Sequence, residues 1–399
     1  MSPTREPEAQ YLQPATRVEP GVVAAAGSAK RLCVLTVVDT LLAAGAETVA
    51  TRIALGLDPS RFESIICSTR RSPPLQVDAV RSAGVEVLEL KRRSRMDVWR
   101  WWPLLRLLRS GRVDVVHAHK FGSNLWLALL TRLAKVPVFV AHEHSWSYET
   151  APRRIADREL IARRANAVIA VSPIDRTRMI ELERIPPQKV VLIANGIPDP
   201  PISNGGRVRQ ELDIPPTAPV VGTVCGLRPE KELDTILRAV ARVVSRRADL
   251  RFLIVGEGPE RRRLERLADE LGSPATFLGY RPNSEVPDLL AAMDVVVLSS
   301  RFEGMPLAVL EWMAAGKAIV ASRVGGIPAI LEDGRDALLV PPRDYAAFAE
   351  AIDRLLADPA ERRRLGEAAQ KRQREEFRLD HTLSLIQDLY ERLRAEAAG

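Results

Sequence analysis

The sequence predicts an α/β protein built from two parallel-sheet domains, and three observations support this fold class. The 399 residues, 46% of them hydrophobic, are enough for two to three domains that each bury a core. From Lys30 onward, short apolar runs that suit strands alternate with amphipathic stretches of helical length, which is typical of βαβ units. Residues 198–218 are rich in proline and glycine and are expected to link the two domains.

We expect four segments along the chain: a disordered tail at 1–29, a first domain at 30–199, a second domain at 200–375 and an amphipathic C-terminal helix at 376–399. The tail has no long apolar core behind a basic start, so it does not resemble a signal peptide. No run of ~18 apolar residues occurs that would predict a membrane span. The scattered cysteines, Cys33, Cys67 and Cys225, each lie in or beside an apolar run and are expected to be buried thiols. These features predict a cytoplasmic protein.

The charge of the chain favours anionic partners. A net charge of +7 and a pI near 9.6 suit nucleotide phosphates or acidic lipids. The arginines are spread along the chain without a DNA- or RNA-binding motif, so we expect no nucleic-acid partner. One segment, residues 91–109, nevertheless concentrates arginines beside Trp99, Trp101 and Trp102. It suits a peripheral contact with the inner face of an anionic membrane, or a crossover helix that packs its Leu/Trp face on the sheet.

The first domain is expected to begin with the strand RLCVLTVV, followed by a loop and a helix. The loop contains Ala44, Gly45, Ala46 and Glu47 in sequence. Gly45 permits a close approach of the backbone to a ligand, and the alternative is an ordinary turn glycine.

Two His-x-His pairs end consecutive strands of the first domain: His117 and His119 end VDVVHAH, and His142 and His144 end PVFVAHEH. The carboxyl ends of neighbouring parallel strands form the ligand crevice of such sheets, so the four side chains are expected to converge on one rim. Three interpretations are open: the histidines contact a ligand as polar groups, they are ordinary residues at strand ends, or they bind a metal ion. No cysteine or carboxylate cluster supports the metal site, and we expect no metal.

The second domain is expected to present several loops at the carboxyl ends of its strands, where open parallel sheets bind nucleotides. The loop GLRPEK places Arg228 and Lys231 after the strand APVVGTVCG, as cations for a phosphate or as a solvated turn. The later loops carry Gly256 and Gly258, then Gly279 and Tyr280, and finally Gly325 and Gly326. Gly-x-Gly alone is a weak signal, because no dinucleotide fingerprint continues it.

Residues 294–321 form the central unit of the second domain and predict strand, loop, helix, turn and strand in that order. Pro306 at the first helical position and Gly316 after the last residue predict a helix over Leu307–Ala315. This helix is apolar nearly all round, which predicts that it is buried.

Two glutamates mark this unit, Glu303 in the loop and Glu311 in the helix. A lone carboxylate in an apolar helix is costly unless something hydrogen-bonds it. Glu311 is therefore expected to accept hydroxyls of a ligand whose phosphates lie at the helix N-terminus, at Met305–Leu307. The alternative is an ion pair with a neighbouring arginine.

The segment EGMPLAVLE, followed by AAGKAIVAS and GGIPAILEDGRDALLVPP, resembles the retaining nucleotide-sugar glycosyltransferases of family 4. The resemblance covers about residues 31–375 and is most specific in the C-terminal half. It implies the GT-B fold, in which two Rossmann-like parallel-sheet domains face each other across a cleft, and a C-terminal helix that returns to the first domain.

The resemblance also implies residue roles. Lys231 would hold the donor diphosphate, with Arg228 as a substitute for the family's arginine, whose position is Gly226 here. His144 matches the histidine that touches the donor sugar, and His142 is a rival. We expect Glu303, His144 and Lys231 to be catalytic and His119 and His142 to contact the acceptor. The expected donor contacts are Glu311, Arg228, Lys231, Gly45, Gly256, Gly258, Gly279, Tyr280, Gly304, Met305, Pro306 and Leu307.

These expectations describe an enzyme that moves a sugar from UDP or GDP to the hydroxyl of a sugar or lipid-linked acceptor, with retention of configuration. No Asp-x-Asp occurs in the chain, so no metal cofactor is expected, and positive side chains and helix N-termini would stabilise the diphosphate. Two alternatives share the architecture: a nucleotide-sugar epimerase, and a non-catalytic regulator that binds a nucleotide sugar. The sugar, the base and the acceptor are not specified by these motifs.

Overall fold

The computed structural model describes residues 30–42, 45–94, 97–144 and 151–399, and these divide into two compact units. Unit 1 comprises the described residues up to Asn195 together with Leu379–Gly399, and unit 2 comprises Gly196–Arg378. The expected boundaries, 199/200 and 375/376, differ from these by a few residues. The tail expected at 1–29 lies outside the described residues.

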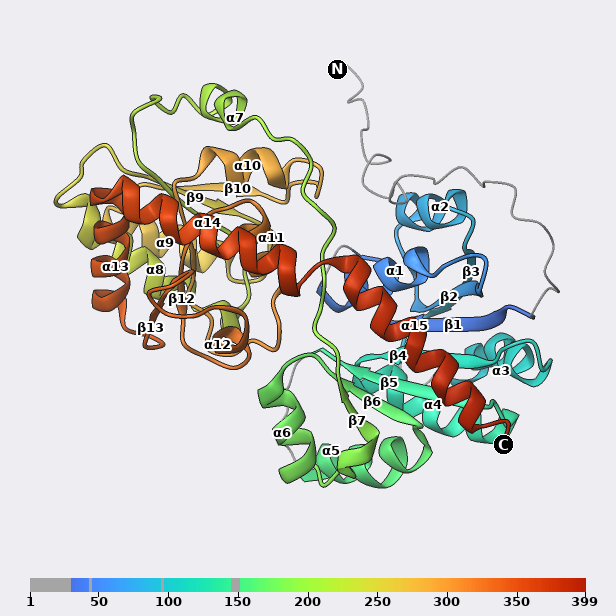
Figure 1. Ribbon diagram of the computed structural model, residues 1–399. Helices are drawn as coiled ribbons and strands as arrows, with labels where there is room; N and C mark the ends of the chain where they lie inside the picture. Colours follow the sequence, from blue (N-terminus) through green and yellow to red (C-terminus); the bar gives the residue numbers. More distant parts are fainter. Residues whose placement is uncertain (1–29, 43–44, 95–96, 145–150) are drawn as a thin grey trace, which may run out of the picture. The chain divides into compact units, whose positions relative to one another are not determined.

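Unit 1 contains a seven-stranded parallel sheet in the order β3-β2-β1-β4-β5-β6-β7 (Figure 1). Its strands are β1 (Leu32–Val38), β2 (Phe62–Arg70), β3 (Glu86–Arg92), β4 (Val115–His119), β5 (Val138–Glu143), β6 (Ala167–Ala170) and β7 (Val190–Leu192). Its helices are α1 (Gly45–Gly56), α2 (Pro74–Ser82), α3 (Trp102–Arg109), α4 (Lys120–Ala134), α5 (Ala151–Ala156), α6 (Pro173–Glu181) and α15 (Leu379–Glu396), with the π-helix η3 (Asp157–Ala162) and the short 3-10 helices η2 (Val98–Trp101) and η4 (Pro187–Lys189).

Unit 2 contains a six-stranded parallel sheet in the order β10-β9-β8-β11-β12-β13. Its strands are β8 (Val220–Val224), β9 (Arg251–Val255), β10 (Ala275–Gly279), β11 (Val295–Leu298), β12 (Ala318–Ser322) and β13 (Leu338–Val340). Its helices are α7 (Gly205–Glu211), α8 (Leu233–Val244), α9 (Arg261–Leu271), α10 (Val286–Ala292), α11 (Leu307–Ala314), α12 (Ile327–Ile330), α13 (Tyr345–Ala357) and α14 (Pro359–Glu376), with the turn η5 (Pro229–Lys231).

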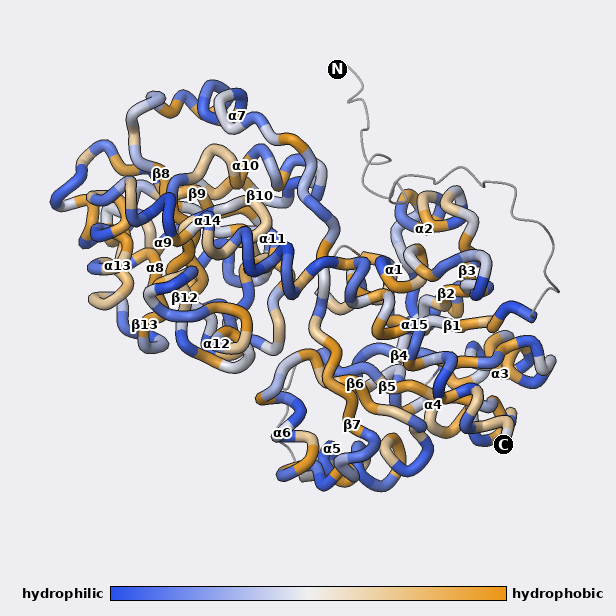
Figure 2. The backbone as a smooth tube through the Cα atoms, in the orientation of Figure 1, coloured by the Kyte–Doolittle hydropathy of each residue, from blue (hydrophilic) through white to orange (hydrophobic). Residues whose placement is uncertain are grey.

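Both sheets follow the doubly wound Rossmann pattern, so the predicted α/β class with two parallel-sheet domains is confirmed. The central strands are buried on both faces, as parallel sheets require, whereas the edge strands β3 and β10 are partly exposed. Figure 2 shows the strands largely in hydrophobic colours. In unit 1 the strand order reverses between β1 and β4, and in unit 2 between β8 and β11. Ligands bind at such switch points in open α/β sheets, beyond the carboxyl ends of the strands.

The C-terminal helix α15 packs into unit 1 through residues far apart in the sequence. Tyr390 is fully buried, and its ring meets that of Phe62 edge-on at a centroid distance of 6.2 Å. Gln387 accepts the backbone N–H of Asp58 at 2.8 Å, and Arg394 pairs with Asp114 at 3.2 Å. Among the described residues, no helix combines the length and apolarity that a bilayer crossing requires.

Candidate active site

In unit 2, the loops that leave β8 and β11 meet at the switch point. Ser299 and Ser300 follow β11 directly and are fully buried. The Ser299 hydroxyl donates to the carbonyl oxygens of Lys231 and Glu232, at 2.8 Å and 2.9 Å. The backbone N–H of Arg301 donates to the carbonyl of Glu230 at 2.8 Å. The two loops are therefore fixed to each other by hydrogen bonds before any ligand binds.

This arrangement brings together Lys231 and Glu303, two residues that the sequence predicts as catalytic. Lys231 Nζ lies 2.5 Å from Glu303 Oε1, and the Ser300 hydroxyl donates to the same oxygen at 2.6 Å. The two charged side chains are 19% and 11% exposed. Burial acts to lower the pKa of Lys231, but the adjacent Glu303 carboxylate outweighs it and the pKa lies above its ordinary value. Lys231 thus remains a cation in a mostly buried setting.

The backbone of Glu303 is held by the turn that follows β12. Gly326 donates its N–H to the Glu303 carbonyl at 2.9 Å. Gly325 has a φ of +51°, and a Cβ there would stand 1.9 Å from the same carbonyl oxygen. Only glycine fits this position, because any side chain would collide with rigid backbone. Gly325 and Gly326 therefore position the catalytic candidate, in addition to the role in ligand approach that the sequence suggests.

Glu311 lies on α11, which begins after Pro306 and ends before Gly316, whose φ is +65°. Pro306 occupies the cap position, with φ −72° and ψ 121°, instead of the first helical residue, and the helix ends at Ala314 instead of Ala315. The expected complete burial of this helix is wrong on one side. Leu310 and Trp312 are fully buried, whereas Glu311 is only half-buried. The carboxylate therefore stands on the more open face of a helix that is otherwise packed into the domain.

The other predicted donor contacts of unit 2 divide into two groups. Arg228 is exposed and makes no ion pair within the described chain, and Tyr280 is 54% exposed. Gly304 and Met305, just before α11, are buried.

The two glycines after β9 are required by the close packing of the backbone. A Cβ at Gly256 would stand 1.9 Å from the carbonyl oxygen of Cys225, and one at Gly258 would stand 2.2 Å from that of Leu227. The expected close approach of this backbone is thus to the neighbouring β8 loop of the protein itself. Gly279 has a φ of +71°, a conformation that side chains rarely adopt.

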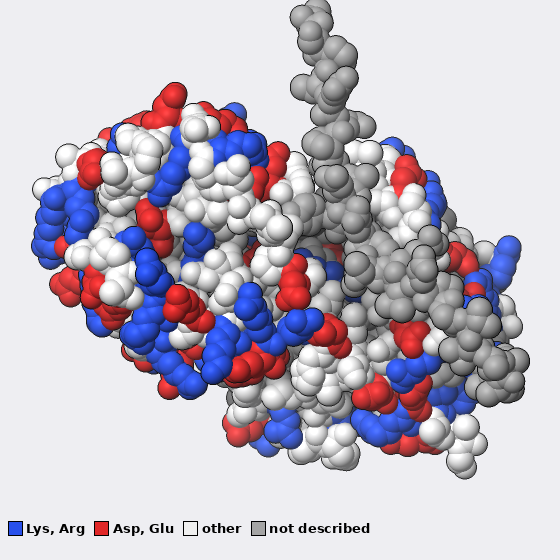
Figure 3. Space-filling model, turned by 45° about the horizontal axis from the view of Figure 1, so that its top comes forward, with Lys and Arg blue, Asp and Glu red and all other residues white. Residues whose placement is uncertain are grey.

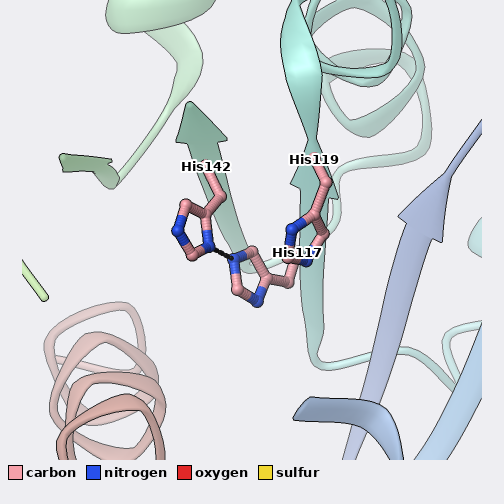
Figure 4. Close-up of side chains that lie close together, drawn as sticks. All are labelled: His117, His119 and His142. Atoms are coloured by element: carbon pink, nitrogen blue, oxygen red, sulfur yellow. Dashed lines mark hydrogen bonds between the residues drawn. The ribbon is translucent and has the colours of Figure 1, made fainter. Parts of the chain in front are cut away.

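In unit 1, the four histidines converge as the sequence predicts. Figure 4 shows His117 and His119 on β4 and His142 on the adjacent strand β5. His117 Nε2 lies 3.1 Å from His142 Nδ1, and His119 Nδ1 lies 2.8 Å from His144 Nε2. The first three are 0–1% exposed, while His144 is half-buried. Burial lowers the pKa of all four, to about 3 for His142, so the cluster is neutral at pH 7.

The hydrogen bonds of this cluster form a chain that starts in α15. The Tyr390 hydroxyl lies 2.5 Å from His117 Nδ1, and burial keeps its pKa well above the ordinary value. If this hydroxyl donates to Nδ1, His117 carries its proton on Nε2 and donates to His142. The Nε2 atoms of His119 and His142 then remain buried without a hydrogen-bond partner.

Three histidines of this cluster have the composition of a metal site. One ring nitrogen from each of His117, His119 and His142 lies within 4.8 Å of the others. However, the rings of His117 and His142 are nearly parallel, 3° apart, and their nitrogens face each other along a hydrogen bond. Lone pairs arranged in this way do not converge on one point, as a bound metal requires. The geometry favours a hydrogen-bonded chain.

The sequence did not indicate the pair formed by Glu47 and Lys120. Lys120 Nζ donates to Glu47 Oε1, and Glu47 is 5% exposed with its second oxygen unpartnered. Lys120 follows β4 with a φ of +68°, a left-handed conformation that is strained for a lysine. Its position directly after His119 was the available signal. Gly45 is the first residue of α1 and not part of a loop, and nothing lies within 4 Å of a Cβ built there; Ala44 is outside the described residues.

A second missed group surrounds the carboxylate between the two histidines of β5. Glu143 accepts from Asn124 at 2.7 Å and from Arg153 at 3.2 Å. Burial raises the pKa of Glu143 to about 7, although Arg153 opposes this shift. Asp157 on η3 also pairs with Arg153, and burial raises its pKa to about 8.

Comparison with known proteins identifies the class of protein to which this fold and site belong. Residues 206–372 match the family described as Glycosyl transferases group 1, and residues 43–199 match the family described as Glycosyltransferase Family 4. The chain therefore belongs to the family 4 glycosyltransferases and is a glycosyltransferase of the GT-B type, as the resemblance implies.

Curated relatives are also named glycosyltransferases. An alpha-D-kanosaminyltransferase of Streptomyces kanamyceticus is 30% identical over 276 residues, which cover 64% of this chain and 71% of the relative. A D-inositol 3-phosphate glycosyltransferase of Stackebrandtia nassauensis is 31% identical over 285 residues, which cover 65% of this chain and 64% of the relative.

Solved structures share the fold. Anabaena Alr3699/HepE in complex with UDP and glucose matches with a TM-score of 0.80 at 21% identity, over 90% of this chain and 100% of that one. Sucrose-phosphate synthase from Thermosynechococcus elongatus matches with a TM-score of 0.78 at 21% identity, over 92% of this chain and 100% of that one.

Proposed function

We propose that the protein transfers a sugar from a nucleoside diphosphate, UDP or GDP, to an acceptor hydroxyl with retention of the anomeric configuration. The observation that carries the proposal is the hydrogen-bonded set of Lys231, Ser300 and Glu303 at the switch point of unit 2. A buried cation held against a carboxylate suits a ligand that presents phosphate oxygens and sugar hydroxyls together. The UDP in the Anabaena structure supports a nucleoside diphosphate as the donor.

Each donor-side residue has a proposed role. Lys231 contacts the diphosphate and offsets the charge that develops on the leaving group, with the exposed Arg228 as a second cation. Glu311 accepts ribose hydroxyls from the open face of α11. Glu303 accepts hydroxyls of the transferred sugar. We propose that the reaction needs no metal ion, because these cations and the N-terminus of α11 supply the positive potential.

Unit 1 is proposed to bind the acceptor. His144 is the most exposed member of the histidine cluster and the one that a ligand reaches first, whereas His119 and His142 lie behind it. Beside them, buried Glu47 holds the Lys120 ammonium group, and the Lys120 side chain is 40% exposed. This ammonium group can donate to a sugar hydroxyl. The acceptor is proposed to be a polyhydroxylated molecule, free or linked to a lipid.

Retention is proposed to proceed by attack on the same face of the sugar from which the nucleotide departs. Glu303, the carboxylate proposed to contact the sugar, is paired with Lys231 and is therefore assigned to hydrogen bonding instead of covalent attack. The anomeric configuration of the product, followed by NMR during turnover, tests this assignment. A product of inverted configuration would contradict it.

The proposed role of the Lys231–Glu303 pair is tested by the variants Lys231→Ala and Glu303→Ala, assayed by release of UDP or GDP in the presence of acceptor. Each is expected to lower kcat by about 10²–10³, the loss found when one transition-state contact is removed. The matched controls are Lys371→Ala and Glu375→Ala on α14, whose side chains are 76% and 61% exposed. These controls are expected to keep full activity.

The same assay separates the alternatives. A transferase attaches the sugar to the acceptor, whereas an epimerase releases a free epimerised sugar without any acceptor. A regulator that only binds the nucleotide sugar would show no turnover in the wild-type protein. If Lys231→Ala and Glu303→Ala both fold and keep the wild-type kcat, the proposal is contradicted.

A further inference from the structure

The segment that leads from β3 to α3 has two faces of different character. On the inner face, Trp101 is 3% exposed and stacks on Trp126 of α4 at a centroid distance of 5.1 Å, while the Arg92 guanidinium lies 4.7 Å from the centroid of the Trp101 ring. Leu104 and Leu108 are also buried. The crossover interpretation of the sequence is therefore confirmed for this face, which packs into the core of unit 1.

The outer face exposes large apolar side chains to solvent. Trp99 is 69% exposed, Trp102 54% and Val98 50%. On α4, Leu129 and Leu133 follow Trp126 at i+3 and i+7 and are 51% and 52% exposed. Single exposed apolar residues are common, but two tryptophans and a valine on consecutive turns form a patch that marks an interaction surface.

The same face carries positive charge without its own counter-charge. Arg93, Arg106 and Arg109 are exposed, and none of them makes an ion pair with a carboxylate in the described chain. Asp97, the acid within the segment, is occupied by the backbone N–H groups of Arg93 and Ser94, at 2.7 Å and 3.2 Å.

The next arginine along the chain is paired: Arg112 just beyond α3 contacts both Glu63 and Glu86, and Figure 3 shows Lys and Arg interspersed with Asp and Glu on the face that it displays. Exposed arginines that make no ion pair within the described chain also occur on unit 2, for example Arg262 and Arg266. What distinguishes the present segment is that such arginines lie beside exposed tryptophans. Together, Val98, Trp99, Trp102, Arg93, Arg106 and Arg109 define what is called here the Trp/Arg face.

We propose that the Trp/Arg face docks the protein onto the surface of a bilayer that contains anionic lipid. Tryptophan rings have their best environment at the depth of lipid headgroups, and arginines beside them are attracted by anionic phosphates. The face belongs to the short elements η2 and α3, and its exposed tryptophans and arginines together suit a surface that is apolar at depth and negatively charged outside. The inference rests on the proposed function and refines its acceptor class to one embedded in the membrane.

The test is flotation of the full-length protein with vesicles of phosphatidylcholine alone, or of phosphatidylcholine mixed with phosphatidylglycerol. We expect the protein to float only with the anionic vesicles and to be released by salt. The variants Trp99→Ala/Trp102→Ala and Arg106→Glu/Arg109→Glu are each expected to lower the bound fraction at least about tenfold.

Two control variants carry the same kinds of change on unit 2. Arg262→Glu/Arg266→Glu reverses two exposed charges on α9, and Tyr345→Ala removes an aromatic ring that is 45% exposed on α13. Both are expected to float like the wild-type protein. Equal losses in the controls and in the Trp/Arg variants would show that only net charge or hydrophobicity matters, which contradicts a defined docking face.

Two further outcomes would overturn the proposal. One is a wild-type protein that stays unbound with both kinds of vesicle. The other is a wild-type dimer in sedimentation that becomes monomeric in Trp99→Ala/Trp102→Ala, which would assign the face to a second copy of the chain. Nucleotide-sugar binding is measured in parallel on the same samples, so a failure of docking is distinguished from a failure of the proposed transferase activity.

Discussion

At the scale of single residues, Gly325 has no catalytic group of its own, yet it determines the position of the catalytic candidate Glu303. Gly325 combines a φ of +51° with a Cβ direction that points into the Glu303 carbonyl. We predict that Gly325→Ala destabilises the protein by about 1–3 kcal/mol or more. It should also lower turnover, because the backbone of Glu303 must shift. Urea unfolding and the UDP or GDP release assay measure the two effects.

The control for this variant lies in the same unit. Gly334 also has a positive φ, +75°, but nothing lies within 4 Å of a Cβ built there. Gly334→Ala therefore carries the cost of the backbone conformation without the collision, and it should leave turnover unchanged. If Gly325→Ala behaves like Gly334→Ala in both assays, the turn does not position Glu303.

The sequence identified several single residues of the site but not their partners. Lys231 and Glu303 could each be predicted from their motifs, while their direct contact joins residues 72 positions apart and needs the strand order of the sheet. Lys120 was not predicted although it directly follows His119, because its pairing with Glu47 joins residues 73 positions apart.

At the scale of secondary-structure elements, the four histidines at the carboxyl ends of β4 and β5 are kept neutral in the folded protein. The cause is burial, which lowers the pKa of each imidazole below the usual 6.5. When the chain unfolds below pH 6.5, these side chains take up protons that they do not bind in the folded state. Their contribution to stability is therefore present above pH 6.5 and is lost as the pH falls.

Two acids in the same unit act in the opposite direction. Burial raises the pKa of Glu143 to about 7 and that of Asp157 to about 8, so both keep a proton in the folded state and release it on unfolding. Near pH 5, unfolding therefore combines proton uptake by the three fully buried histidines with proton release by these acids and by Asp175, whose pKa burial also raises. Half-buried His144 adds to this uptake.

We predict that, below pH 6, the free energy of unfolding of the wild type falls more steeply with pH than that of His142→Gln, by up to about 1.4 kcal/mol per pH unit, the equivalent of one proton. Urea unfolding at pH 7, 6 and 5 measures it. His142→Gln cannot titrate and should flatten this slope, whereas His381→Gln on α15 changes an exposed histidine and should not. An identical slope in the wild type and in His142→Gln would contradict the account.

Element boundaries could be predicted where a local residue sets them. Pro306 and Gly316 delimit α11 to within a residue of the expected positions. The partial exposure of one face of α11 could not be predicted, because an apolar sequence does not determine which neighbouring elements cover each face of a helix. Likewise, the division of the Trp/Arg segment into a packed and an exposed face depends on the contact between Trp101 and Trp126, which belong to different helices.

At the scale of the whole molecule, the alternation of strands and helices was sufficient to predict two parallel-sheet units. Their strand orders were not predicted, because the rule for βαβ connections fixes the hand of each crossover and leaves the order of the strands open. The packing of α15 into unit 1 was anticipated only through family resemblance. Its hydrogen bond from Tyr390 to His117 spans 273 positions, a separation over which sequence patterns carry no information.

The measurement that tests the central claim most directly is calorimetric titration with a panel of UDP- and GDP-sugars in buffer containing EDTA. The account predicts that one of them binds the wild-type protein, and that Lys231→Ala and Glu311→Ala each weaken binding about tenfold or more through loss of a charge-assisted hydrogen bond. The Lys371→Ala control should bind like the wild type. Binding that needs an added metal ion, or that is unchanged in both site variants, would contradict it.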